Sequence, residues 1–426
     1  MTEQQQRSDR QHTVIRSLGL GLITGAADDD CSAIGTYAQA GAQLGYKALW
    51  TAPVTFPMMV AVVYLSGKLG QVTGQGLFNV LRTHYSHRFV YVVLAGVVAG
   101  NTIEAGADIG GMAAAMGILL HWPQWVLVLC ITAATLVLQI WGSYRVIRNI
   151  FRVIALSLTA YIFSAFLAHP QVGEAVRGTL VPSLRFNKET LSILVAIVGT
   201  SLSAYLYTWQ SNQEVEEKEE AGKHTVRERR GASEGELRSG LWDVVFGMLF
   251  SNVVMYFIIL ATAATLYASG KHDITTAAEA AQSLTPLAGR AAGLLFTLGI
   301  IGVGFLAIPV MTTGAAYDIC QSLGWKNGLA YPPSKAKGFY GVITALTLVA
   351  MSLNFLGINP MRALVISGIV QGFSTPPLMM LIMIMTNKPS IMGEQVNGRV
   401  ANIFGWATTL AIFSASAGLV VTWFLQ

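Results

Sequence analysis

The chain has 426 residues, of which 53% are hydrophobic and only 12% are charged. Soluble domains carry about twice that charged fraction, so the composition excludes an ordinary soluble protein and indicates a chain that crosses a lipid bilayer several times. The formal net charge of +5 does not indicate a nucleic-acid partner, because the basic residues lie between apolar segments, where the topology of membrane proteins places them.

Residues 1–15 are polar and contain neither an apolar signal core nor a cleavage site, so we expect a short cytoplasmic tail. Residues 16–426 are expected to form a single transmembrane domain. A membrane helix needs about 20 mostly apolar residues, and eleven segments meet this requirement. The predicted spans are 17–43 (interrupted), 48–67, 89–116, 124–141, 150–168, 189–213, 244–268, 290–316, 339–355, 362–385 and 400–425.

The distribution of Lys and Arg indicates the orientation. With a cytoplasmic N-terminus, most of the 27 Lys and Arg residues fall on the cytoplasmic side, as the positive-inside rule requires. An odd number of spans then places the C-terminus outside. We therefore predict an integral protein of the cell membrane, the inner one where there are two. The mixed charges of residues 214–238 are expected to form a solvated, partly helical cytoplasmic loop.

Three successive carboxylates, Asp28, Asp29 and Asp30, interrupt the first apolar span. Burying them is expensive unless a ligand or water reaches them, and an ionisable residue inside a membrane span indicates a functional site. Small residues lie on both sides of the triplet and allow the helix to break there, which frees backbone groups for a ligand.

The third span carries Glu104 and Asp108, which are four residues apart and therefore lie on one helix face. Two carboxylates in mid-membrane repel each other unless water, a cation or a proton lies between them. The pair is consistent with an ion or proton pathway. The alternative is that this face lines an aqueous vestibule without binding anything specific.

The sixth span has a polar, small-residue centre at 199–205, with the sequence GTSLSAY. It lies five spans after the first interruption, and two interrupted spans at corresponding positions are typical of transporters built from inverted repeats. On this interpretation the repeats cover about 16–168 and 189–385, and 400–425 is an additional helix. The alternative for Thr200, Ser201 and Ser203 is ordinary hydrogen bonding to a preceding backbone carbonyl.

Three segments carry a resemblance to a known family. Residues 39–50 (QAGAQLGYKALW) resemble the end of the first helix of the NRAMP (natural resistance-associated macrophage protein) divalent-metal transporters. Residues 181–183 (VPS) and 391–397 (IMGEQVN) match the segments before the sixth and eleventh helices. The resemblance covers almost the whole chain. It implies an all-α, LeuT-like membrane fold of two inverted five-helix repeats plus an eleventh helix, with the substrate between unwound spans 1 and 6.

The sequence departs from this family at the metal site. The family's first-helix motif Asp-Pro-x-Asn falls on Asp30-Cys31-Ser32-Ala33, so the Asp is retained and the Asn is absent. The family's sixth-helix motif Met-Pro-His falls on residues 203–205, where Ser203 replaces the thioether and Tyr205 replaces the His. Similar departures occur in NRAMP-related magnesium transporters and in other distant branches of the family.

A site of carboxylates and hydroxyls without a soft donor suits a hydrated hard cation such as Mg²⁺ better than Mn²⁺ or Fe²⁺. Successive side chains of a helix point about 100° apart, so the three aspartates need not all face the ion, and Asp30 is the first candidate. The predicted substrate- or ion-binding residues are Asp28, Asp29, Asp30, Ser32, Thr200, Ser203 and Tyr205, with Asp30, Thr200 and Ser203 as metal ligands and Glu104 and Asp108 as an ion or proton pathway.

The predicted function is secondary transport of a divalent metal cation, with Mg²⁺ favoured and coupling to H⁺ or Na⁺ left open. The alternative is an ion-coupled transporter of another small polar or cationic solute on the same fold. We find no nucleophile–base pair or cofactor motif, so neither an enzyme nor a resident cofactor is expected. The expected partners are the substrate and the lipid bilayer. The sequence does not determine the oligomeric state, and a monomer is compatible with it.

Overall fold

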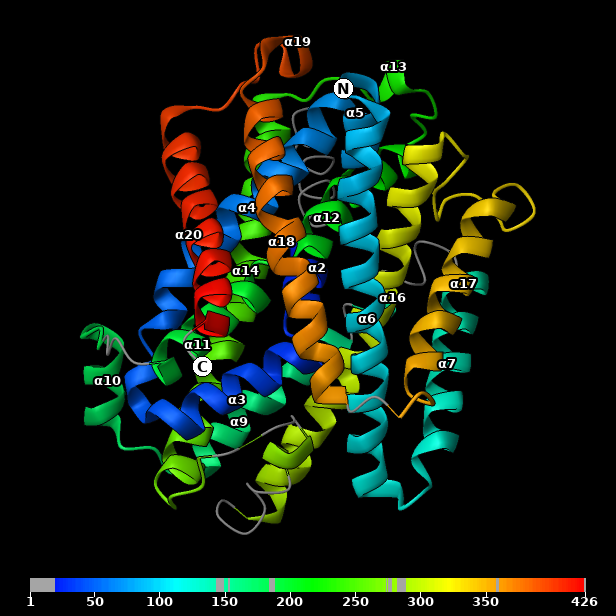
Figure 1. Ribbon diagram of the computed structural model, residues 1–426. Coiled ribbons are helices and arrows are strands. Elements are labelled where there is room, and N and C mark those ends of the chain that lie inside the picture. Colours follow the sequence, from blue (N-terminus) through cyan, green and yellow to red (C-terminus); the bar gives the residue numbers. More distant parts are fainter. Residues whose placement is uncertain are drawn as a thin grey trace, which may run out of the picture.

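The computed structural model describes residues 20–142, 149–151, 154–183, 188–272, 274, 278–281, 289–357 and 360–424, so the predicted tail 1–15 lies outside the described residues. The described chain is helical (Figure 1). Its α-helices are α2 (Leu20–Asp28), α3 (Cys31–Leu44), α4 (Thr51–Thr73), α5 (Leu77–His84), α6 (His87–Leu120), α7 (Gln124–Trp141), α9 (Thr159–Leu167), α10 (Val172–Leu180), α11 (Lys188–Ser201), α12 (Ala204–Glu220), α13 (Val226–Arg229), α14 (Glu234–Thr262), α16 (Arg290–Leu323), α17 (Lys337–Leu353), α18 (Pro360–Thr386), α19 (Pro389–Met392) and α20 (Arg399–Phe424). Short 3₁₀ turns cover Gly45–Ala48 and Leu156–Leu158, and a π-helical turn covers Ala263–Tyr267.

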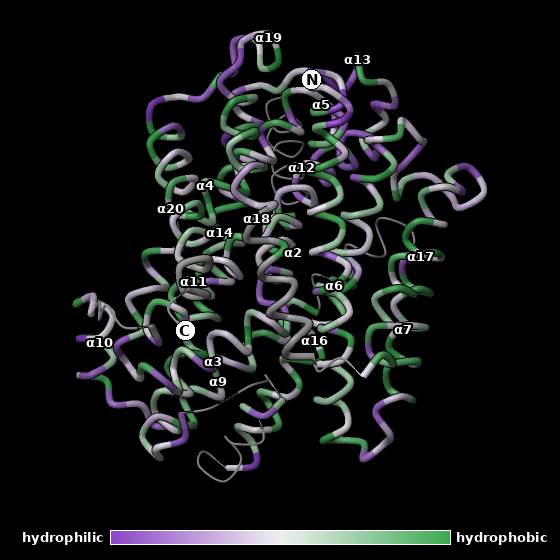
Figure 2. The backbone as a smooth tube through the Cα atoms, in the orientation of Figure 1, coloured by the Kyte–Doolittle hydropathy of each residue, from purple (hydrophilic) through white to green (hydrophobic). Residues whose placement is uncertain are grey.

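Within the described residues, eight helical segments are long and apolar enough to cross a membrane. They coincide with the second to eighth predicted spans and with the last one. The ninth and tenth correspond to the shorter apolar helices Lys337–Leu353 and Ser374–Thr386. Figure 2 shows hydrophobic residues along the middle of the bundle and hydrophilic residues concentrated towards its two ends. The placement of α20 outside the two repeats stays a prediction.

The two predicted interruptions are present. In the first span, α2 ends at Asp28 and α3 begins at Cys31, with Asp30 as the N-cap of α3. In the sixth span, α11 ends at Ser201 and α12 begins at Ala204, with Ser203 in an extended conformation as the N-cap. Each break leaves backbone amides and carbonyls without a helical partner in the middle of the bundle.

Helix α2 lies in the interior, where it packs against α14, α16 and α12 (Figure 1). Its contact with α14 is made through backbone, since a Cβ atom added at Gly21, Gly25 or Gly247 would collide with main-chain atoms of the opposite helix. Small residues permit such close approach of membrane helices, and the resulting van der Waals contact is a main source of their association. This contact fixes the height of the Asp28–Asp30 break relative to α14.

The prediction that residues 214–238 are solvated is wrong for their first part. Helix α12 continues to Glu220, and Glu216 is only 2% exposed. The Lys218 ammonium donates to the backbone carbonyls of Gln71, Arg229 and Gly231. These charged side chains pack over the end of the bundle that carries α13, where they form hydrogen bonds with other parts of the chain. Sequence hydropathy alone does not show such partners.

Candidate ion site between two broken helices

The carboxylate of Asp30 connects the two helix breaks. Its Oδ1 accepts a hydrogen bond from the backbone amide of Ala33 at 2.7 Å and one from the Ser32 hydroxyl at 2.7 Å. Its Oδ2 accepts from the Tyr205 hydroxyl of α12 at 3.2 Å. As an N-cap, Asp30 also lies at the positive end of the α3 dipole, which stabilises a negative charge there.

Ser32 links this carboxylate to two further elements. Its Oγ lies 3.2 Å from Oε1 of Glu104 on α6 and 3.5 Å from the Thr200 hydroxyl of α11. Oxygen atoms from the first, third and sixth predicted spans therefore converge around one small side chain. We call Asp30, Ser32, Glu104, Thr200 and Tyr205 the central oxygen cluster.

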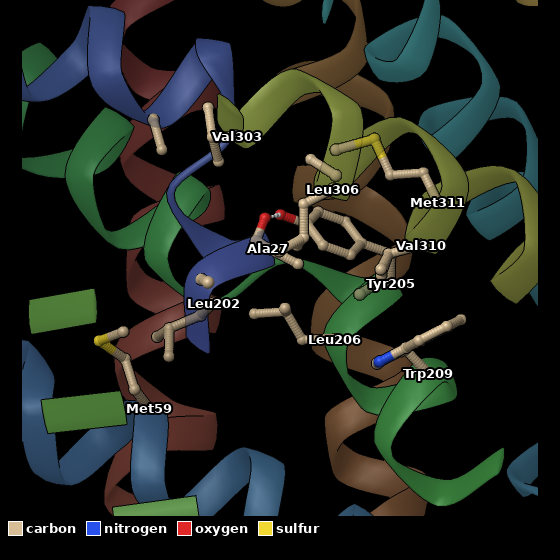
Figure 3. Packing of buried hydrophobic residues seen from close by; sticks show 14 of the residues in the cluster. Ala27, Met59, Leu202, Tyr205, Leu206, Trp209, Val303, Leu306, Val310 and Met311 are labelled. Atoms are coloured by element: carbon tan, nitrogen blue, oxygen red, sulfur yellow. Dashed lines mark hydrogen bonds between the residues drawn. The ribbon is translucent and has the colours of Figure 1, made fainter. Parts of the chain in front are cut away.

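The Tyr205 hydroxyl has a second role. It is 2.8 Å from the carbonyl oxygen of Ala27, the contact drawn in Figure 3, and it is fully buried. Apolar residues surround this hydrogen bond, among them Leu202 and Leu206 of the sixth span and Leu306 of α16 (Figure 3). Tyr205 therefore joins α12 to the end of α2 and to Asp30 in the buried interior of the bundle.

The other two aspartates face α14. The hydroxyl of Ser251 lies 3.0 Å from Oδ2 of Asp28 and 3.2 Å from Oδ1 of Asp29. The remaining oxygen of each carboxylate has no hydrogen-bond partner within the described chain. The Asp triplet is therefore divided between Asp30 in the central oxygen cluster and the Asp28–Asp29 pair beside Ser251.

Asp108 lies next to the cluster, one turn beyond Glu104. It is fully buried and faces the amides of Cys31 and Ser32 at the start of α3, but neither carboxylate oxygen forms a hydrogen bond with the described residues. The Cys31 thiol is directed towards the carbonyl oxygens of Asp108 and Ile300, at 3.9 and 4.0 Å. The Cys31 sulfur therefore contacts these backbone carbonyls and does not contact Asp30.

Ser203 is placed differently from its prediction as a ligand. Its hydroxyl donates to the carbonyl oxygens of Thr200, at 3.0 Å, and Gly199, at 3.4 Å. This is the local bonding that the sequence left as the alternative. The described structure does not bring the Ser203 hydroxyl into contact with Asp30, whereas it does bring Tyr205 there.

The cluster contains few strong metal ligands. Among the described residues, no three His, Cys, Asp or Glu side chains lie close enough together to hold a metal ion. A cation at Asp30 would therefore complete its shell with hydroxyl and backbone oxygens and with water. The geometry provides one carboxylate from the break, a second from Glu104 and neutral oxygens from three other side chains.

Sequence reasoning missed two polar residues of this region. Ser251, in the seventh predicted span, bridges Asp28 and Asp29, and only its position in a membrane span could have indicated a role. Asp318 lies beyond the predicted end of the eighth span at residue 316, but α16 continues to Leu323 and buries it completely. A longer window that tolerated one acidic residue would have included Asp318.

Comparison with known families identifies the protein family of this chain. The family model described as natural resistance-associated macrophage protein-like matches residues 21–422. The chain is a member of the NRAMP-like family. Relatives of this NRAMP-like protein include proteins named divalent metal cation transporter MntH from two strains of Klebsiella pneumoniae, each 26% identical over 409 residues, which covers 95% of this chain and 93% of the relative.

Solved structures agree with the family. A manganese transporter of Eremococcus coleocola superposes with a TM-score of 0.75 at 16% identity and covers 95% of this chain and 86% of its own. A Na⁺-coupled sialic acid symporter gives a TM-score of 0.60 at 12% identity, with coverages of 94% and 89%. At such identities the likeness shows the fold, and the LeuT-like architecture of an integral membrane protein is confirmed.

Proposed function

We propose that this NRAMP-like protein is a secondary transporter of a divalent metal cation. The observation that carries the proposal is the central oxygen cluster, in which Asp30, Glu104 and Ser32 converge at the meeting point of two broken helices. Broken helices at corresponding positions mark the substrate site of transporters with inverted repeats. The MntH relatives, named as divalent metal cation transporters, support the same substrate class.

Among divalent cations, we propose that Mg²⁺ is preferred over Mn²⁺ and Fe²⁺. The ligand atoms of the cluster are all oxygen, and the one neighbouring thiol points towards two backbone carbonyls instead. Mg²⁺ keeps several waters and uses one or two carboxylates, whereas a soft sulfur donor favours transition metals. Within this proposal Glu104 of the cluster and the neighbouring Asp108 form the ion or proton pathway, and Ser203 is not a ligand.

Flux measurements in proteoliposomes test the proposal. The purified chain is reconstituted with an Mg²⁺ indicator or an Mn²⁺ indicator inside the vesicles, and uptake is compared over the same concentration range. We expect saturable Mg²⁺ uptake and weaker Mn²⁺ uptake. Preferential uptake of Mn²⁺ or Fe²⁺ would contradict the Mg²⁺ preference. Absence of any divalent flux, with uptake of an organic cation, would favour the alternative transporter of a small solute.

The two serines next to the helix breaks give a matched pair of variants. Ser32→Ala removes the hydroxyl that joins Asp30, Glu104 and Thr200, so we expect it to weaken cation uptake about tenfold, the equivalent of one good hydrogen bond or ligand. Ser203→Ala removes a hydroxyl bonded to backbone carbonyls at the end of α11, and we expect uptake within about twofold of the wild type. The concentration for half-maximal Mg²⁺ flux measures both. Equal effects of the two changes would argue against the placement of the site.

A further inference from the structure

A second buried carboxylate lies on the helix that faces α12. Asp318 of α16 is fully buried, and neither of its carboxylate oxygens has a hydrogen-bond partner within the described chain. It lies in a segment that is apolar and long enough to cross a membrane. An ionisable residue at such a position is expensive to keep and indicates a functional site.

The neighbour of this carboxylate on α12 is Thr208. Its hydroxyl lies within hydrogen-bonding reach of Asp318 and also 3.1 Å from the backbone carbonyl of Tyr205, so it can donate to either of them. A Cβ atom added at Gly314, one turn before Asp318, would lie 3.6 Å from the same hydroxyl. Asp318 and Thr208 therefore bring a carboxylate and a hydroxyl oxygen together in the membrane interior, and oxygens of both kinds are ligands that a hard cation accepts.

Asp318 belongs to a polar face that continues from the central oxygen cluster. On α12, Tyr205, Thr208 and Asn212 follow at spacings of three and four residues, so they lie on one face of the helix. Tyr205 contacts Asp30, and Asn212 accepts a hydrogen bond from Gln321 of α16 at 2.6 Å. Because Gln321 follows Asp318 by three residues on α16, the carboxylate lies between the central cluster and the Asn212–Gln321 pair.

Beyond that pair the protein opens into a small polar cavity of about 180 Å³. Gln321 is one of its lining residues, together with Asn79, Glu219 and Arg229. The cavity lies at the end of the bundle that carries α5 and α13 (Figure 1), the predicted cytoplasmic side. The polar face of α12 and α16 thus runs from the central cluster to the polar cavity, with Asp318 between the two.

We propose that Asp318 is a second binding station for the transported divalent cation, occupied on the way between the central cluster and the polar cavity. One carboxylate with the neutral oxygens of Thr208 and Asn212, completed by water, is a ligand set that a hydrated hard cation accepts. The separation of the Asn212–Gln321 pair would open the station to the cavity. The inference rests on the proposed function, because it assigns a place on the path of the same cargo.

Asp318→Asn tests the station while keeping the size of the side chain. The full-length protein is measured for equilibrium Mg²⁺ binding in detergent and for Mg²⁺ flux in proteoliposomes. We expect Mg²⁺ affinity at the central cluster to stay within about twofold of the wild type, and the maximal flux to fall about tenfold, the loss of one charged ligand. Cys320→Ala, a buried change on the same helix, is the matched control, and we expect wild-type flux from it.

Several results would overturn the inference. Wild-type flux in Asp318→Asn would exclude the station. A large loss of equilibrium Mg²⁺ binding together with flux would assign Asp318 a structural role at the central site. Unchanged Mg²⁺ flux that has lost its response to a proton gradient would assign it to proton movement.

A second variant and a wild-type measurement separate a failure of this inference from a folding defect and from a failure of the proposed function. If Asp318→Asn does not yield folded protein, Thr208→Val replaces it, with the same expected fall in maximal flux. If the wild-type protein transports no divalent cation at all, the proposed function itself is refuted. The wild-type flux measurement alone shows this.

Discussion

Asp30→Asn is expected to abolish Mg²⁺ uptake, with a loss on the order of 100-fold or more, because the central oxygen cluster loses the charge that attracts a dication. The substitution is otherwise conservative. Asn is as good an N-cap as Asp, so it can still accept the hydrogen bond from the Ala33 amide that begins α3. The loss of transport is therefore expected without a loss of folded protein.

Asp30→Ala provides the comparison. It removes both the charge and the N-cap, and an N-cap contributes about 1 kcal/mol to helix stability. We expect both variants to be inactive and only Asp30→Ala to show a lower melting temperature. Mg²⁺ flux and thermal unfolding of the purified proteins measure the two effects separately. Mg²⁺ and Mn²⁺ flux that persists in Asp30→Asn would exclude this carboxylate as the cation ligand.

The sequence predicted the part of the site that follows from local chemistry. Acidic or hydroxyl residues in the middle of an apolar span carry a clear signal, and both helix breaks lie where this signal placed them. The convergence of Asp30, Ser32 and Thr200 then follows from the pairing of the two interrupted spans. The resemblance to the family independently implies that the first and sixth spans together form the site.

The sequence could not predict contacts between residues far apart in the chain or the direction in which a side chain points. Asp28 and Asp29 bond to Ser251, more than 220 residues away, and no local pattern connects them. The Ser203 hydroxyl could turn to the preceding backbone carbonyls or to the site, and both directions fit the same sequence. Asp318 was missed because the predicted eighth span ends at residue 316, whereas α16 continues to Leu323.

Gly247 of α14 is expected to tolerate no larger side chain. A Cβ atom at this position would overlap the backbone of Gly21 and Leu22 in α2, and a backbone cannot rotate out of the way as a side chain can. Overpacking in a close-packed interior costs about 1–3 kcal/mol, and more where the neighbour cannot move. We expect Gly247→Ala to lower the melting temperature clearly, and Gly247→Leu to prevent recovery of monodisperse protein.

Gly341 of α17 is the matched control for this effect. It lies in a helix like Gly247, but a Cβ atom there would meet no heavy atom within 4 Å. Ala is favoured over Gly in a helix by roughly 1 kcal/mol, so Gly341→Ala should leave the melting temperature unchanged or raise it. Thermal unfolding of the purified proteins in one detergent compares them. A similar melting temperature for both Ala variants would show that the backbones of α2 and α14 are not in close contact. Because α2 ends at Asp28, that result would also argue against this backbone contact as what holds Asp28 and Asp29 beside Ser251.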